Sequence, residues 1–163
     1  MTEIGATPTA DRRAVSIDLR EDWPAALRHS GFDETSPTAW SAEGLLAYLP
    51  PDAQDRLFDN ITALSAQGSQ LATEHVPDPN AFTEERLQQI SERWRTFGFD
   101  LNAADLFYVG ERSVVVDYLA GHDWQVDAHP AKELYARNGF EFPDQPTMAV
   151  FGEMSYVNAT LKK

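Results

Sequence analysis

The chain has 163 residues, of which 42% are apolar, and this fits one globular domain with a substantial core. It contains no cysteine, which excludes a disulfide framework, a thiolate metal site and a thiol nucleophile. Its 13 basic and 26 acidic residues give a net charge of −13, a field that repels phosphate backbones and anionic lipid and argues against nucleic acid as a partner.

Apolar periodicity and turn residues predict that strands and helices alternate along the chain. The strands are expected at 13–18, 38–43, 69–76 and 123–130, with a long closing strand or hairpin at 147–163. The helices are expected at 22–30, 50–66, within 77–99, at 111–120 and at 131–138.

This alternation indicates an α/β fold whose sheet has parallel pairing, right-handed crossovers and helices on both faces. The last strand is bracketed by turn residues rather than by a helix, which indicates an antiparallel strand at the end of the sheet. We expect one domain over residues 1–163. Residues 77–110 are interpreted as an insertion between core elements rather than as a separate domain.

No apolar run reaches the roughly 20 residues that a membrane helix needs. The amino-terminal stretch also lacks the charged-then-apolar pattern of a secretory signal. We therefore expect a cytoplasmic protein without a membrane partner. The four histidines have no metal-ligand spacing, and no G-x-S-x-G motif is present, so neither a metal site nor a hydrolase is supported.

Two carboxylates follow the ends of predicted strands. Asp18, with Leu19 after it, ends the first strand, and Glu43 ends the second. Acids at the carboxyl edge of an open α/β sheet often face a ligand, but each can instead cap the helical segment that follows it. The second strand is apolar, so the carboxylate of Glu43 at its end should be partly buried and should require a hydrogen-bond donor.

Aromatic residues and one histidine have both a functional and a structural interpretation. Aromatic side chains near the strand ends suggest a pocket, although a core role is the commoner one. They are Trp23, Trp40, Tyr48 and Phe58. His75 follows Glu74 at the end of the third strand, and a lone histidine is more often structural or solvent-facing than catalytic.

Two segments within residues 5–74 resemble a known family: GATPTADRRAVSIDLREDWPAALRHSGFD and PTAWSAEGLLAYLPPDAQDRLFDNITALSAQGS. They are similar to the central part of actinobacterial, mycobacterial-type S-adenosylmethionine-dependent methyltransferases, which themselves resemble the leucine carboxyl methyltransferases. The resemblance continues more weakly through HDWQVDAHPAKELYARNGF to the final strand. It implies a class I methyltransferase-like (Rossmann-like) fold, a seven-stranded sheet with its last strand inserted antiparallel.

The resemblance also implies site residues. Asp18 and Leu19 would contact the adenine of S-adenosyl-L-methionine. Glu43, with Gly44 and Leu45 after it, would lie beside the methionine end of the cofactor and the transfer site. Residues 77–122 would form a cap over the acceptor, whose identity the motifs do not specify, and no catalytic residue is assigned.

The family's first two strands, its Gly-rich loop and its ribose-binding acid have no counterpart here, and none of the nine glycines forms a G-x-G. We therefore expect the carboxyl-terminal part of a methyltransferase, with a sheet truncated on its N-terminal side. The unpaired edge would favour a homo-oligomer or association with the missing amino-terminal half. The expected reaction is metal-free O-methyl transfer, with a carboxylate as one candidate acceptor. The alternative is a non-catalytic α/β module or remnant that acts only with a partner or as an oligomer.

Overall fold

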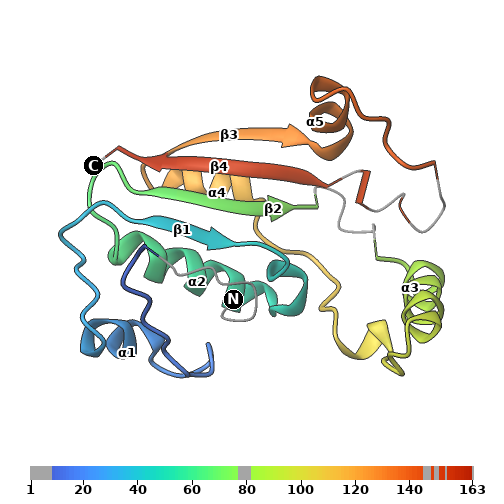
Figure 1. Ribbon diagram of the computed structural model, residues 1–163, viewed down its shortest axis with the longest axis horizontal. Coiled ribbons are helices and arrows are strands. Elements are labelled where there is room, and N and C mark those ends of the chain that lie inside the picture. The colour runs from blue at the N-terminus through green and yellow to red at the C-terminus, as the bar shows by residue number, and fades with distance from the viewer. Residues whose placement is uncertain (1–8, 77–81, 145–147, 149–150, 153, 163) are drawn as a thin grey trace.

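The computed structural model describes residues 9–76, 82–144, 148, 151–152 and 154–162, which form a sheet with helices around it (Figure 1). The strands are β1 (Ala39–Ala42), β2 (Gln70–His75), β3 (Trp124–Pro130) and β4 (Ser155–Leu161). The helices are α1 (Trp23–His29), α2 (Pro51–Ala63), α3 (Glu84–Thr96), α4 (Val115–Gly121) and α5 (Ala131–Arg137). Two short 3-10 turns are η2 (Leu46–Tyr48) and η3 (Ala103–Asp105).

The sheet has the strand order β1-β2-β4-β3, with β1 and β2 parallel and β4 antiparallel to both of its neighbours. The fold is therefore α/β with a mixed sheet, as the alternation of elements predicts. The direction of the last strand is also predicted correctly. Its expected place at the end of the sheet is wrong, because β4 lies between β2 and β3. Its buried residues Val157, Ala159 and Leu161 are suited to an interior strand.

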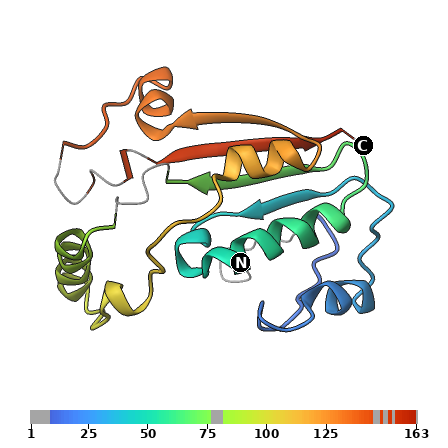
Figure 2. The same ribbon diagram turned by 180° about the vertical axis from the view of Figure 1, so that it is seen from behind.

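One face of the sheet is covered by α2 and α4, which Figure 2 shows in front of the strands. Leu71, Val157 and Trp124 from the sheet join one core with side chains of both helices. Those helical residues are Leu57, Phe58, Ile61, Val115 and Leu119. The rings of Phe58 and Tyr118 lie 6.2 Å apart, so the two helices also meet each other.

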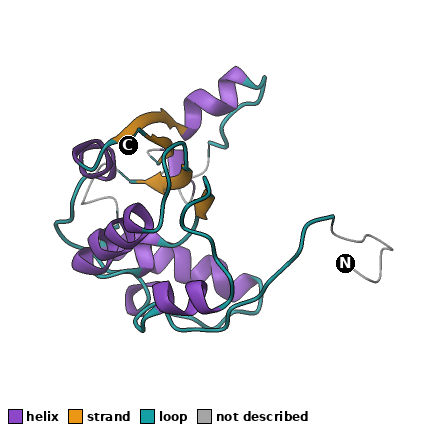
Figure 3. Ribbon diagram, turned by 90° about the vertical axis from the view of Figure 1, so that its left-hand side faces the viewer, coloured by secondary structure: helices purple, strands orange, loops and turns teal. Residues whose placement is uncertain are grey.

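The opposite face carries exposed polar residues such as Ser41, Gln70 and Asn158. The expectation of helices on both faces is therefore wrong for the residues that the structure describes. The alternating burial of β2 and β4 agrees with this, since every second side chain points toward the covered face and the ones between point toward the open face. In Figure 3 most helices gather on one side of the strands, and the described amino-terminal coil extends away from them.

The strand expected at 13–18 is not formed, and this segment runs as coil. A strand needs a neighbour for its backbone hydrogen bonds, and no described strand lies beside this one. Instead, Arg13 Nη1 donates to the Ser30 carbonyl oxygen at 3.0 Å, and Ile17 packs against the core. The alternating sequence therefore supplies a partly buried side chain but no strand pairing.

The helix boundaries mostly follow the local signals. Asp22 caps α1 by accepting from the Ala25 amide at 3.0 Å, as predicted. The exception is α4, which begins at Val115 rather than at 111, because Arg112 and Ser113 bond to α2 and its preceding loop as extended chain. None of the described helices is long and apolar enough to cross a bilayer.

A second, smaller hydrophobic cluster lies beside the carboxyl ends of β1 and β2. We call residues 82–107 the side lobe, since α3 and η3 build it (Figure 1). Its buried residues are Leu87, Ile90 and Ala103, with Phe82, Trp94 and Phe107 packed against them. The Ser91 hydroxyl accepts from the Ala103 amide at 2.9 Å and joins the helix to the turn. Residues 77–81 of the expected insertion lie outside the described residues.

The main core predicts a clear contrast between two phenylalanines. Phe58 is fully buried, so Phe58→Ala should lower the free energy of unfolding by about 3–5 kcal/mol. Phe97 is 66% exposed, and Phe97→Ala should change it by less than about 0.5 kcal/mol. Urea denaturation followed by circular dichroism measures both, and equal effects would contradict this description of the core.

Candidate functional site

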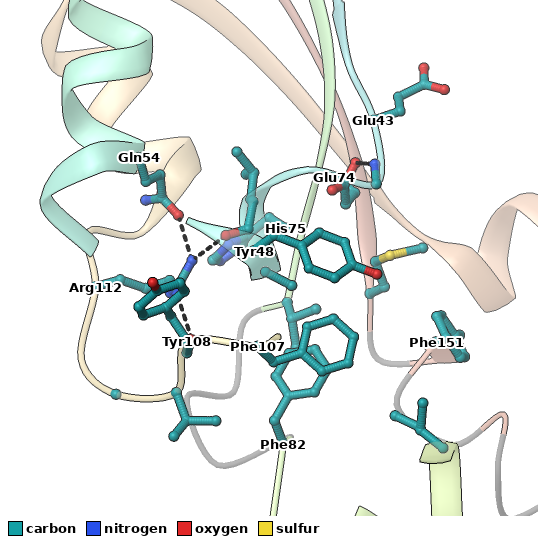
Figure 4. A pocket seen from close by; sticks show the side chains of 18 of the residues that line it. Glu43, Tyr48, Gln54, Glu74, His75, Phe82, Phe107, Tyr108, Arg112 and Phe151 are labelled. Carbon is teal, nitrogen blue, oxygen red and sulfur yellow. Dashed lines mark hydrogen bonds between the residues drawn. The ribbon is translucent and has the colours of Figure 1, made fainter. Parts of the chain in front are cut away.

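A cavity of about 1010 Å³ opens at the carboxyl ends of β1 and β2 (Figure 4). Its walls come from the ends of these strands, from η2, from the side lobe and from the loop before α4. Ligand-binding clefts are commonly about 300–1,000 Å³, so this volume is enough for a small molecule and part of a second one. The cavity is therefore the candidate functional site.

One wall of the cavity is aromatic. The ring of Phe107 stacks on Tyr48 at a centroid distance of 4.9 Å and on Phe82 at 5.2 Å. Trp94 lies 6.1 Å from the same ring. Because Tyr48 belongs to η2 and the others to the side lobe, Phe107 joins the two parts (Figure 4). Such a wall suits an apolar part of a ligand.

The carboxylate of Glu74 fixes the loop at the rim of the cavity. Its Oε2 accepts from the Gly44 amide at 2.9 Å, and its Oε1 accepts from the Leu45 amide at 3.1 Å. Gly44 has φ +66°, a left-handed conformation that favours glycine. The end of β2 therefore fixes the loop that follows β1, and both oxygens of Glu74 are occupied.

Arg112 holds the polar end of the cavity together. Its Nη1 donates to the Leu46 carbonyl oxygen at 2.8 Å and to Gln54 Oε1 at 3.2 Å. Its Nη2 donates to the carbonyl oxygens of Tyr108 at 2.7 Å and Leu49 at 3.3 Å. Burial lowers the pKa of Arg112 from its ordinary value, and neighbouring Asp55 opposes this shift. The guanidinium thus connects η2, α2 and the loop before α4.

His75 lies at the same polar end, where it is only 7% exposed. Its Nε2 is fully enclosed and has no hydrogen-bond partner among the residues that the structure describes. Burial lowers the pKa of His75 below its ordinary value, the charge of Arg112 lowers it further, and Asp117 partly offsets these effects. The imidazole is therefore neutral at pH 7. No cluster of His, Asp or Glu in the described part of the chain has the geometry of a metal site.

The structure brings Glu43 and Gly44 to the cavity, while Leu45 packs against the main core. The expectation that Glu43 is partly buried and bonded to a donor is wrong. Its side chain is exposed, has no hydrogen-bond partner among the described residues, and points away from the aromatic wall (Figure 4). The backbone donors next to it are already taken by Glu74.

Asp18 and Leu19 do not line the cavity, and both are exposed. A hydrogen-bonded pair with the Arg20 side chain is the main cause that lowers the pKa of Asp18 to about 2. The Asp18 pairing also raises the pKa of Arg20, to which Tyr108 of the cavity makes a smaller contribution. The Asp18–Arg20 pair therefore lies within electrostatic range of the cavity without forming part of its wall.

Sequence reasoning missed the side chains that build the site. Neither Arg112 nor Gln54 stands at a strand end or in a recognisable motif, and Glu74 was noted only as a neighbour of His75. Their roles depend on contacts between distant segments, such as the 58 positions that separate Gln54 from Arg112. Of the aromatic residues considered, Trp23 and Phe58 are core, Trp40 packs against the core, and Tyr48 lines the cavity.

Comparison with known proteins shows similarity of this chain to proteins named as methyltransferases. Residues 1–62 match the family described as leucine carboxyl methyltransferase. The chain is 73% identical, over 99% of its length and 53% of the relative's, to a Mycobacterium avium protein named "Putative S-adenosyl-L-methionine-dependent methyltransferase". A Mycobacterium marinum protein of the same name is 60% identical over 99% of this chain and 54% of its own length. The chain thus spans about half the length of the curated relatives it matches.

The two glutamates at the rim allow a matched test. Glu74→Gln keeps one acceptor oxygen but turns an amino group toward a backbone N–H, so it should lower the free energy of unfolding by about 1–2 kcal/mol. Hydrogen exchange at the Gly44 and Leu45 amides should accelerate. Glu43→Gln also removes one negative charge, but Glu43 makes no hydrogen bond among the described residues. This substitution should therefore leave the free energy of unfolding and the amide exchange unchanged. Equal behaviour of the two variants would contradict the role given to Glu74.

Burial of His75 predicts a pH dependence of stability. Its pKa is lowered on folding, so below about pH 6.5 the unfolded chain binds a proton that the folded chain does not. The free energy of unfolding should therefore fall as the pH drops through about 6.5 and level off below the folded-state pKa. Urea titrations from about pH 8 to about pH 5 measure this. His75→Gln should remove this part of the slope, whereas His29→Gln, at an exposed site, should retain it.

Proposed function

We propose, from the kinship of this chain with mycobacterial proteins of the leucine carboxyl methyltransferase type, that it takes part in methyl transfer from S-adenosyl-L-methionine to an oxygen. The fold proposed for the whole protein is the class I, Rossmann-like one. Within it, this chain supplies the cavity for the acceptor and the strand-end residues beside the methyl donor. Because the chain spans about half of its relatives, the complete activity is a proposal about the whole protein.

One observation carries the proposal: the aromatic cavity lies at the carboxyl edge of two parallel strands in a sheet whose last strand is inserted antiparallel. Open α/β sheets bind ligands at this edge, because the loops there are free to vary while the strands stay fixed. The inserted strand matches the topology that the family resemblance implies. An apolar wall also helps to exclude water from a reacting oxygen.

The rim residues fit the charge of the cofactor. S-adenosyl-L-methionine carries a sulfonium and an ammonium, and Glu43 offers an exposed carboxylate with no partner among the described residues. Gly44 has open space where a Cβ would stand, so a ligand can approach the backbone there. Asp18 would accept a hydrogen bond from the adenine amino group only in exchange for part of its pairing with Arg20.

In the proposed reaction the main task of the protein is to align the two reactants. The bound cofactor supplies an activated methyl group, and the protein orients the acceptor oxygen in line with it. A carboxylate acceptor, as the family's name suggests, would be nucleophilic without a base. The side lobe would act as the cap over the acceptor. We confine this role to residues before 115, since α4 packs on the sheet.

A second candidate function rests on the edge of the sheet. Among the described residues β1 pairs only with β2, so its other edge offers unpaired backbone groups. Such an edge favours pairing with another chain. The second candidate is accordingly a non-catalytic α/β module, without cofactor binding of its own, that acts with a partner or as an oligomer.

Titration calorimetry with S-adenosyl-L-methionine tests the first candidate. We expect binding to the wild-type chain that Glu43→Ala weakens by about tenfold or more, since a charge-assisted hydrogen bond is lost. Asp18→Ala should weaken it as well. Glu141→Ala removes an exposed acid far along the sequence and should have no effect.

Absence of binding by a chain with an intact far-UV spectrum would contradict the cofactor site in this chain. Sedimentation velocity would then test the oligomeric form of the second candidate, which requires a dimer or larger species. Binding that resists both Glu43→Ala and Asp18→Ala would contradict the assignment of these residues.

A further inference from the structure

The exposed apolar side chains of this protein gather around the cavity. Twelve large apolar residues of the described chain are exposed, and seven of these twelve line the cavity. They include Tyr48, Phe97, Tyr108, Val109 and Phe151. Single exposed apolar residues are normal on a soluble protein, whereas a contiguous group marks a place where something apolar binds. The cavity is therefore the place on the described surface where apolar contact with another molecule is expected.

The apolar surface is hollow rather than flat. It encloses about 1010 Å³, at the upper end of the volumes that small-molecule clefts have. Its walls come from segments far apart in the sequence, such as those of Tyr48 and Phe107, whose rings stack at 4.9 Å. The aromatic contacts hold these segments together in the chain itself. A hollow that is already formed in this way accepts a molecule inside it.

Several polar side chains of the cavity serve the protein itself. Glu74 accepts hydrogen bonds from two backbone amides, and Arg112 donates to three backbone carbonyl oxygens and to Gln54. Gln54 in turn donates to the Ser113 carbonyl oxygen at 3.0 Å. A small polar molecule is recognised through several hydrogen bonds that converge on it. The cavity instead favours a ligand that is held mainly by burial of apolar surface.

The arrangement of the walls favours a long ligand over a compact one. Figure 4 shows Arg112 and Phe151 at opposite sides of the cavity, with the rings of Phe82 and Phe107 between them. An extended molecule can contact the apolar wall along this whole path. A compact molecule would leave part of the wall in water and would gain less from burial.

The wall also contains side chains that adapt to a flexible ligand. Besides the rings, it has the aliphatic side chains of Val76, Ile90 and Val109 and the thioethers of Met148 and Met154. Methionine is unbranched and polarizable, and it fills irregular gaps beside an apolar partner. Such a mixture of rings, branched side chains and thioethers suits an aliphatic chain.

We propose that the cavity binds a lipid-like acceptor, a single long aliphatic chain that ends in an alcohol or a carboxylate. The chain lies along the aromatic wall, and its oxygen end meets the methyl donor near the rim at Glu43. This inference rests on the proposed function, since it names the acceptor class of the same site.

The transfer step is the same for both kinds of oxygen. A lone pair of the acceptor oxygen forms the new bond to the methyl carbon, while the bond between that carbon and sulfur breaks and leaves its electron pair on sulfur, which becomes a neutral thioether. A carboxylate yields a methyl ester without loss of a proton. An alcohol yields a methyl ether and releases its proton to water.

A series of straight-chain probes tests the proposal. Titration calorimetry on the full chain measures the binding of butanol, hexanol, octanol and decanol. Each methylene group that becomes buried should tighten binding about fourfold. Triethylene glycol, which is nearly as long as decanol but has a polar chain, should bind far more weakly. Decanoate carries a carboxylate on the same kind of chain, so its affinity relative to that of decanol distinguishes the two oxygen ends.

Two phenylalanines in one segment provide a matched pair of variants. Phe97 and Phe99 are both exposed, but only Phe97 lines the cavity. Phe97→Asp should weaken decanol binding about threefold or more, because a charge replaces apolar contact, whereas Phe99→Asp should leave it unchanged. Val109→Asp, at an exposed position of the cavity wall, should weaken it about tenfold. Far-UV spectra check that the variants fold. Should Val109→Asp fail to fold, the matched pair still decides the question.

The proposal is overturned if no alcohol binds, if affinity does not rise with chain length, or if triethylene glycol binds as tightly as decanol. Equal effects of Phe97→Asp and Phe99→Asp would overturn it as well. Sedimentation velocity covers the remaining possibility, an interface between two copies of the chain. If Val109→Asp and Phe97→Asp abolish self-association and leave decanol affinity unchanged, the apolar surface is that interface and the proposal fails.

These outcomes are distinct from the cofactor titration. Cofactor binding without decanol binding would leave the methyltransferase proposal standing and refute the acceptor class. Decanol binding that depends on Val109 and Phe97, without cofactor binding, would support the acceptor site and refute the cofactor site in this chain.

Discussion

The insertion of β4 between β2 and β3 is the constraint on which the rest of the structure depends. The strands β2 and β3 run parallel but do not pair with each other, because the carboxyl-terminal strand β4 lies between them and pairs with both. Val157 and Ala159 of β4 also lie at the centre of the core that α2 and α4 cover. A strand from the end of the chain therefore determines both the spacing of the earlier strands and the place where their carboxyl ends meet.

The carboxyl edge of β1 and β2 is shaped by side chains that form hydrogen bonds to backbone groups. Glu74 fixes the loop after β1, and Arg112 fixes η2 through the carbonyl oxygens of Leu46 and Leu49. A loop over a cavity cannot satisfy its own polar groups by packing alone, since they would face apolar space. Two buried or half-buried charges thus give the cavity a rigid rim, and the aromatic wall can stay apolar.

The sequence predicts those parts of the molecule that short-range signals determine. The Asp22 cap, the antiparallel direction of β4 and the alternation of strand and helix all follow from neighbouring residues. The segment 13–18 has the same quality of strand pattern, yet it runs as coil, because pairing depends on a partner that the pattern does not contain. Glu43 and Glu74 could not be ranked for the same reason: which acid meets the free amides depends on how β1 and β2 align.

The polar groups around the cavity differ in what they leave open to a ligand. The rim offers Glu43, a carboxylate free of described partners that suits a cationic methyl donor. The polar end is occupied by Arg112, with the imidazole of His75 enclosed nearby. Because Glu74 and Arg112 use their charges on the backbone, neither competes for the methyl donor. A methyl donor at the rim and an acceptor on the aromatic wall would then meet over η2, whose position both charged residues fix. The same contacts that stabilise the loop would thereby align the two reacting atoms.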